Sequence, residues 1–180
     1  DSCGNFNGEV SGWDVSNVTN MVSLFLNCIT FNQDISSWDV SNVTNMEFMF
    51  AQAYAFNQDI TGWQTGKVTN MFETFRNADS FDYSIGNWDI SSVDNMQNIF
   101  WENDGMSVFS FDATITGWDT DTSGTAGDGI DDIPSNIDMG SLALGHCSAS
   151  NAITDLTTNY GWTITSDFSY DCGFTMEVTV

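Results

Sequence analysis

"FNQDISSWDVSNVTNM", residues 31–46, decides the fold because it is one copy of an internal sequence repeat. Residues 6–21 read "FNGEVSGWDVSNVTNM", with Trp-Asp-Val and Asn-Met at the same places. The opening Phe recurs three times at intervals of 25 residues and once after 30, at Phe6, Phe31, Phe56, Phe81 and Phe111. Such a period predicts a solenoid, in which each repeat buries its apolar face on its neighbours.

The second repeat shows two hydrophobic patterns. Trp38 and Val40 flank Asp39 with a period of two, which is typical of a strand. Apolar residues between Val43 and Ala53 recur at steps of three and four, which is typical of a helix. We therefore expect an α+β repeat solenoid of leucine-rich-repeat-like type, with about five 25-residue coils. Each coil would hold a short strand and a short helical arc, and a parallel β-helix-like solenoid is the alternative.

An asparagine stands before methionine in four repeats. Stacked at one point of every coil, these side chains would hydrogen-bond the backbone of a turn. Two Asn-Val-Thr triplets, at Asn17 and Asn42, also match the N-glycosylation sequon. They fall inside the repeat pattern, which favours a structural role. The four asparagines are Asn20, Asn45, Asn70 and Asn95.

The four cysteines form an even set without metal-binding spacing. Cys3 and Cys28 each lie three residues before the Phe of a repeat, so they are equivalent positions in adjacent coils. Strands stack about 4.8 Å apart, a separation that a disulfide accepts. We predict a Cys3–Cys28 disulfide and a second one between Cys147 and Cys172 that closes a C-terminal cap. Free buried thiols are the alternative; two disulfides would indicate an extracytoplasmic protein.

Charge excludes several functions. The chain has 25 acidic residues against two basic ones, Lys67 and Arg76, and a formal net charge of −23. It lacks the basic footprint that nucleic-acid binding requires, and anionic membrane surfaces are disfavoured. No apolar run approaches the roughly 20 residues that would span a bilayer, so direct membrane insertion is not expected. The charge favours either solubility in a salty medium or carboxylates that hold divalent cations.

The repeats should occupy residues 1–120. An acidic loop and a C-terminal cap should follow over residues 121–172, with a helix near residues 148–159, a helix stop at Gly161 and an extended piece at residues 162–165. Residues 173–180 would begin a linker or a further domain.

One row of side chains should face outward from the strands, because the residue between Trp and Val points away from the core. Aligned like charges repel each other, so an acidic row favours either a ligand or a solvated face. The break in the row, where "WDVSN" becomes "WQTGK", adds Lys67. The candidate ligand-binding residues are Asp14, Asp39, Gln64, Asp89 and Lys67.

The stretch "DTDTSG", residues 119–124, opens like a calcium-binding loop. The full EF-hand pattern fails because its twelfth position is Ile130 instead of Glu. A Ca²⁺ site here would use Asp119, Asp121, Ser123, Asp128 and Asp131, and a solvated acidic turn is the alternative.

Catalysis is not expected. The chain has one histidine, His146, and it lies beside Cys147 in the cap. A nucleophile, a base and an orienting group do not emerge from the sequence, so we expect no enzyme.

The segment "FNQDISSWDVSNVTNMEFMFAQAYAFNQDI", residues 31–60, closely resembles the bacterial surface-protein twenty-six-residue repeat, a BspA-like branch of the leucine-rich repeats. The segment "CSASNAITDLTTNYGWTIT", residues 147–165, resembles the cap that follows such repeats in marine bacterial surface proteins. The resemblance implies a leucine-rich-repeat-like solenoid, secretion by the type IX route and cell-surface attachment, without an enzymatic activity. The chain departs from the pattern at residues 63–67 and again at residues 101–110, where five extra residues are expected.

We therefore expect an extracellular, non-catalytic binding or adhesion module of a larger secreted or cell-surface protein. Its partner would be a protein or glycan on a cell surface, or a neighbouring domain of the same assembly. The alternatives are a structural spacer or partner-docking domain of a surface filament, and ice or mineral binding. The row Thr19, Thr44 and Thr69 argues for ice binding, but Asp94 breaks that row.

Overall fold

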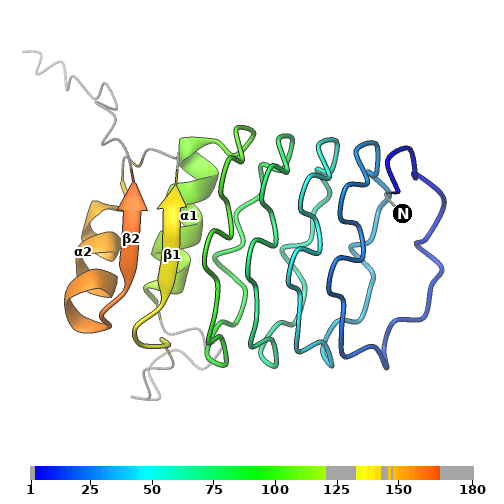
Figure 1. Ribbon diagram of the computed structural model, residues 1–180. Helices are drawn as coiled ribbons and strands as arrows, with labels where there is room; N and C mark the ends of the chain where they lie inside the picture. The colour runs from blue at the N-terminus through cyan, green and yellow to red at the C-terminus, as the bar shows by residue number, and fades with distance from the viewer. Residues whose placement is uncertain (1–2, 121–132, 143–145, 147, 167–180) are drawn as a thin grey trace, which may run out of the picture.

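The computed structural model describes residues 3–120, 133–142, 146 and 148–166 of the 180-residue chain. Four loops of chain lie one behind another, and a group of helices and strands covers the last of them (Figure 1). We name the loops coils 1 to 4, over residues 6–30, 31–55, 56–80 and 81–105. The regular elements are α1 (Val108–Trp118), β1 (Asp138–Leu142), α2 (Ser150–Asn159) and β2 (Thr163–Ser166), and β1 pairs with β2 in parallel.

The core consists of columns of identical side chains. Equivalent Phe rings of successive coils stack with centroids 5.8–6.1 Å apart, from Phe6 through Phe31 and Phe56 to Phe81. Trp63 and Trp88 stack in the same way at 6.0 Å. Because each coil repeats the same residues at the same places, one packing solution serves every interface between coils.

Four of the repeated tryptophans also hydrogen-bond the coil before them. The indole N–H of Trp38 donates to the carbonyl of Val10 at 3.2 Å, and that of Trp63 donates to Ile35 at 3.2 Å. Trp88 and Trp118 donate to Ile60 and Ile85. A buried indole needs such a partner, so the repeated Trp fixes the register between coils as well as filling the core.

The expected helical arc is absent from the four coils. In coil 2, alternate backbone N–H groups donate to the carbonyls of coil 3, as Met46 does to Asn70 and Phe48 does to Phe72, each at 2.9 Å. The peptide groups between them close tight turns, such as Met49 N–H to the carbonyl of Met46. Phe48 lies in the left-handed region, with φ of 55°. The stretch is therefore a run of turns held by a ladder between coils, and the helix prediction was wrong here.

The expected strand around Trp38 to Val40 is also absent. A turn ends at Trp38, whose N–H donates to Ile35, and the next turn begins at Val40, whose carbonyl accepts from Val43. The predicted alternation holds, because Trp38 and Val40 are buried and Asp39 is exposed. Parallel bridges between coils lie instead at the repeated asparagines, from Asn20 through Asn45 and Asn70 to Asn95.

These asparagines hold the backbone as predicted. The side-chain oxygen of Asn45 accepts the N–H of Glu47 at 2.8 Å, and Asn70 accepts that of Phe72 at 3.0 Å. Asn20 and Asn95 do the same for the N–H two residues on. Each asparagine thus starts the run of turns that follows it.

A helix, α1, takes the place of a fifth coil, whereas the sequence predicts about five 25-residue coils. Register is kept up to Ser107, whose N–H donates to Asp82, 25 residues earlier. The five extra residues fall between Met106 and Trp118, within and around α1, and not across residues 101–110 as expected. A helix rises only about 1.5 Å per residue, so it needs more residues than an extended chain to cover the same distance.

The rest of the cap agrees with expectation where it is described. The expected helix is α2, Gly161 follows it with φ of +71°, and β2 is the extended piece. Trp162 is buried and donates its indole N–H to the carbonyl of Pro134 at 2.6 Å. The tail from residue 167 on lies outside the described residues.

Cys3 and Cys28 form the predicted disulfide, with their Cα atoms 4.8 Å apart. The bond ties the chain before coil 1 to the end of that coil. The second predicted pair, Cys147 and Cys172, lies outside the described residues.

Candidate functional site

The predicted outward row faces solvent, but its members also hold turns. Asp14, Asp39 and Gln64 are exposed, and Asp89 is half-buried. The carboxylate of Asp39 accepts the backbone N–H of Ser41 at 3.0 Å, and Asp89 accepts both the N–H and the hydroxyl of Ser91. The repeated Asp-x-Ser is therefore a turn motif as well as a row of surface charge.

Hydrogen bonding favours the ionised form of two members of this row, Asp14 and Asp39. Bonds from the side chain and backbone of Ser16 lower the pKa of Asp14, and bonds from Ser41 lower that of Asp39. The charge of Asp14 raises the pKa of Asp39 and that of Lys67 lowers it, both as smaller effects. A carboxylate that accepts hydrogen bonds releases its proton more easily, so the lowered pKa keeps Asp14 and Asp39 anionic below the ordinary carboxyl range.

Coil 3 interrupts the row of aspartates, because Gln64 stands in the place of Asp, and the surface is hollowed at this position. The hollow has a volume of about 560 Å³, and we call it the coil-3 hollow. It is lined by Ser41, Thr61, Gln64, Gly66, Lys67 and Asp89, among other residues. Gly66 replaces the serine of the other coils, and a Cβ at this position would collide with the carboxylate of Asp89. The missing side chain therefore helps to leave this part of the surface open.

The coil-3 hollow brings opposite charges together. The ammonium of Lys67 donates to the side-chain oxygen of Asn42 at 2.7 Å, and Lys67 is exposed. Gln64 adds an exposed amide, and Thr65 below it is buried and donates its hydroxyl to the carbonyl of Asp89 at 2.9 Å. Of the predicted ligand-binding residues, Gln64, Lys67 and Asp89 line this hollow, whereas Asp14 lines a different hollow at coil 1.

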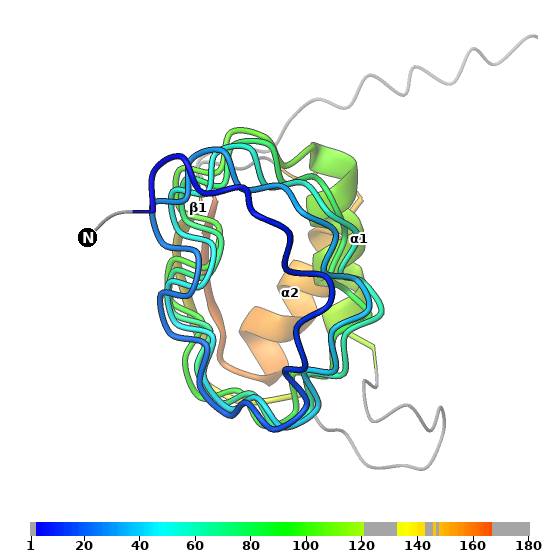
Figure 2. The ribbon, with the colours of Figure 1, turned by 90° about the vertical axis from the view of Figure 1, so that its right-hand side faces the viewer.

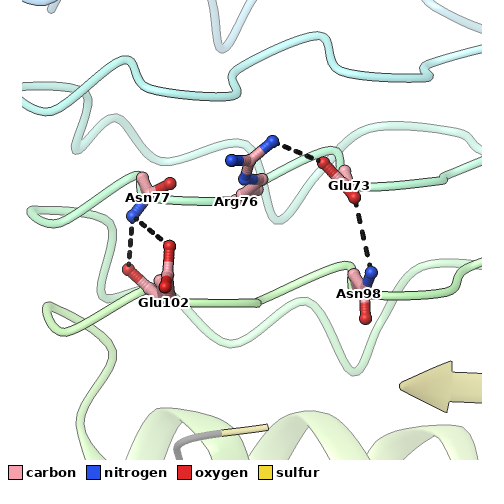
Figure 3. Close-up of polar contacts among 5 residues, drawn as sticks. All are labelled: Glu73, Arg76, Asn77, Asn98 and Glu102. Carbon is pink, nitrogen blue, oxygen red and sulfur yellow. Dashed lines mark hydrogen bonds and ion pairs between the residues drawn. The ribbon is translucent and has the colours of Figure 1, made fainter. Parts of the chain in front are cut away.

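The other basic residue is held by neighbouring side chains. Arg76 forms an ion pair with Glu73 at 3.0 Å, and its guanidinium lies 4.8 Å from the ring centre of Trp101. Glu73 also accepts from Asn98, and Asn77 donates to Glu102, so these polar groups join coils 3 and 4 (Figure 3). Sequence reasoning missed this cluster, since only coil 3 has Glu and Arg at these repeat positions.

A second row of side-chain bonds was also missed, at the "FNQD" corner. The N–H of Asn32 donates to the side chain of Asn7 at 3.0 Å, and Asn57 donates to Asn32 at 2.9 Å. Gln33 adds its amide to the same oxygen of Asn7. The signal was present, because Asn follows the Phe at this place in coils 1 to 3.

The predicted calcium site lies mostly outside the described residues. Asp119 is described, at the C-terminal cap of α1, whereas Asp121, Ser123, Asp128 and Asp131 are not. Within the described part of the chain, no three His, Cys, Asp or Glu side chains lie close enough to hold a metal ion. The calcium site stays a prediction.

Two further features bear on function. The Nδ1 atom of His146 lies 3.4 Å from the hydroxyl of Ser150, an exposed contact near the start of α2. Among the described residues, none of the helices has both the length and the apolar character needed to cross a membrane.

A family model described as "Mycoplasma protein of unknown function, DUF285" matches residues 1–118. The chain belongs to this family. DUF285 is a family related to surface proteins and linked with BspA-like repeats. The DUF285 match spans coils 1 to 4 and α1, and so includes the coil-3 hollow. No curated protein and no solved structure matches the chain.

Proposed function

We propose that the chain is an extracellular, non-catalytic binding module of a larger secreted or cell-surface protein, and that it binds its ligand in the coil-3 hollow. The observation that supports this proposal is a coincidence of sequence and shape. Coil 3 departs from the repeat pattern at residues 63–67, and its outward face is hollowed at the same residues. A scaffold needs no such departure, whereas a binding surface needs one place that differs from the rest.

The chemistry of the hollow favours a polar, uncharged or cationic ligand. Lys67 donates, Asp89 accepts, and Gln64 does both, which suits the hydroxyl groups of a sugar or the backbone of a peptide. The ionised row of Asp14 and Asp39 repels anions from the same face. The proposed partner is therefore a glycan or a protein segment of a cell surface.

The setting is proposed on three grounds. The Cys3–Cys28 disulfide is typical of oxidising compartments. The net charge of −23 suits a salty medium, and the family is related to surface proteins. We extend the proposal to a leucine-rich-repeat-like relationship of the coils, to type IX secretion and to Ca²⁺ in the loop after α1, as the sequence predicts.

A screen on a glycan array and on a panel of surface proteins tests the proposal. The unmodified chain should bind a subset of the array, and Gln64→Ala and Lys67→Ala should each weaken that binding at least tenfold. Asn17→Ala is the matched control, because Asn17 holds the place of Lys67 in coil 1 and is exposed. Binding that tolerates both coil-3 changes, or that Asn17→Ala abolishes, places the ligand elsewhere.

Ice or mineral binding is less well supported. The hydroxyl of Thr44 donates to the carbonyl of Thr19 at 3.0 Å, and that of Thr69 donates to Thr44 at 3.3 Å. These hydroxyl protons are engaged between coils, so the row offers few free donors to a flat surface.

A further inference from the structure

Coil 3 lacks a hydrogen-bond acceptor that the other coils supply. In coils 1, 2 and 4 an aspartate carboxylate accepts the backbone N–H of a serine two residues further on, at 3.0–3.1 Å. In coil 3 Gln64 stands in the place of the aspartate and Gly66 in the place of the serine. The N–H of Gly66 donates to no described residue. The departure from the repeat therefore leaves one backbone donor without its usual partner.

The backbone of coil 3 otherwise follows the repeat. Viewed along the stack, coils 2 to 4 take closely similar paths (Figure 2). The turn before the departure is kept, because the N–H of Thr61 donates to Asp59, and the turn after it is closed by Val68 N–H to the carbonyl of Thr65. The N–H of Gly66 therefore faces the place that an aspartate carboxylate fills in the other coils. In coil 3 this place belongs to the coil-3 hollow.

An open acceptor lies next to this open donor. The Oδ1 atom of Asp89 accepts both bonds from Ser91, whereas its Oδ2 atom accepts from no described residue. A Cβ at Gly66 would collide with this Oδ2, so the two open groups are neighbours. Lys67 adds an ammonium that keeps two N–H groups beyond the one it donates to Asn42. A donor, an acceptor and a cation thus meet in one hollow.

We propose that the ligand of the coil-3 hollow is a neutral glycan, one hydroxyl group of which occupies the place of the missing carboxylate. The hydroxyl oxygen accepts from the N–H of Gly66, and its proton is donated to Oδ2 of Asp89. A hydroxyl suits neighbouring open groups because it accepts and donates from a single atom. Lys67 donates to a second hydroxyl of the same sugar. This inference rests on the proposed function and narrows its ligand from a glycan or a protein segment to a glycan.

The other two ligand classes fit less well. The carbonyl and the N–H of a trans amide point in opposite directions, so one peptide group does not reach a donor and an acceptor that lie side by side. Among the residues that line the hollow, only Trp63 has a large apolar side chain, and it is 4% exposed. A peptide therefore has no pocket for an apolar anchor. An acidic sugar would bring like charge toward Asp39 and Asp89.

An NMR titration of the full chain labelled with ¹⁵N tests the ligand class. The probes are the methyl glycosides of glucose, galactose, mannose and N-acetylglucosamine, with glucuronic acid and N-acetylglycine N-methylamide as the acidic and the peptide probe. At least one glycoside should give a saturable shift of the Gly66 amide, whereas the other two probes should not. The Ser16 amide is the matched control, because Asp14 already accepts its N–H. Absence of a saturable Gly66 shift with all four glycosides, or an equal shift with the peptide probe, overturns the proposal.

Variants at Gln64 test the missing acceptor. Gln64→Asn and Gln64→Asp place a short side-chain oxygen where the other coils have one, so they should bind the glycan about tenfold more weakly than Gln64→Ala, which supplies no acceptor. If the amide of Gln64 were the only contact, Gln64→Asn would bind at least as well as Gln64→Ala, which would contradict the proposal. A loss with Gln64→Asp alone would also contradict it, since charge would then explain the effect.

Two further readouts separate this inference from the proposed function. Amide hydrogen exchange at Gly66 should be slower in Gln64→Asn and Gln64→Asp than in the wild type, and unchanged exchange contradicts the proposal. On the array, binding to a surface protein instead of a glycan, weakened by Lys67→Ala, would overturn this inference and leave the proposed function standing. A chain that binds no member of the array would overturn both.

Discussion

At the scale of single residues, the fold depends on side chains that bond a neighbouring coil. Trp38 fills the core and also donates to the carbonyl of Val10, a buried residue whose carbonyl accepts the N–H of Trp13 as well. Trp13 holds the same repeat position but is half exposed, and no described residue accepts from its indole. Replacing tryptophan by phenylalanine is the same chemical change at both positions. The difference between the two losses of stability therefore measures the contact between coils.

We predict that Trp38→Phe lowers the free energy of unfolding by about 2–3 kcal/mol, because it removes a buried hydrogen bond between coils and leaves a void beside it. Trp13→Phe should cost less than about 1 kcal/mol. Urea denaturation followed by circular dichroism measures both. Equal losses at the two positions would show that the bond between coils contributes little.

Asp39 allows a residue-scale prediction on ionisation. Ser41→Ala removes the hydroxyl bond, so the pKa of Asp39 should rise toward the ordinary value of about 3.9. Because the folded-state pKa lies below the unfolded one, the bond stabilises the fold above about pH 4. That contribution is lost as the pH falls through the lowered pKa. An NMR titration of the Asp39 carboxyl carbon measures the shift, with Asp14 as reference; an unchanged pKa of Asp39 would contradict a contribution of the Ser41 hydroxyl.

At the scale of elements, the sequence predicted the period, the buried residues and the cap helix, but not the backbone of the coils. Steps of three and four between Val43 and Ala53 are shared by a helix and by a run of tight turns. Phe48 did not indicate the left-handed backbone that it adopts, because a bulky residue rarely has positive φ. The N–H of Phe48 donates to Phe72 and its ring packs on the ring of Phe72, a partner that lies about 25 residues away in the sequence.

The left-handed position of Gln52, with φ of 60°, yields a test of this backbone. Gln52→Gly should raise the free energy of unfolding by about 0.5–1 kcal/mol, because glycine adopts positive φ without steric cost. Gln52→Val should lower it by about 1–2 kcal/mol, since a β-branched residue is strained in that region. Thermal melts of the two variants decide the matter. A stable valine variant together with an unstable glycine variant would fit a helix and contradict the run of turns.

At the scale of the whole molecule, the stack is closed at one end by α1, α2, β1 and β2 and stapled near the other by the disulfide (Figure 1). Cys3 and Cys28 enclose one repeat length of chain. Reduction, or the pair of changes Cys3→Ser and Cys28→Ala, should lower the free energy of unfolding by about 2–3 kcal/mol. Hydrogen exchange should then show early opening of coil 1, and uniform opening of all coils would be the contrary result.

The candidate site was only partly readable from the sequence. The alternation of buried and exposed residues predicted the exposure of Asp14, Asp39 and Gln64. The departure from the repeat at residues 63–67 indicated that the surface of coil 3 differs from that of the other coils. The role of Asp39 as a turn acceptor did not follow, because it depends on where the N–H of Ser41 points. The coil-3 hollow also needed the structure, because the close approach of Gly66 and Asp89 joins different coils.

We propose that the repeat supplies the scaffold and that the departure from the repeat in coil 3 supplies the binding surface. A four-residue variant tests this proposal by restoring the repeat sequence in coil 3. It combines Gln64→Asp, Thr65→Val, Gly66→Ser and Lys67→Asn, which together turn "WQTGK" into "WDVSN". Wild-type and restored chains are then compared on the same glycan and surface-protein array, with thermal melts alongside. We expect the restored chain to melt at or near the wild-type temperature and to lose its binding. A restored chain that is folded and binds as the wild type does would show that coil 3 is not the binding surface.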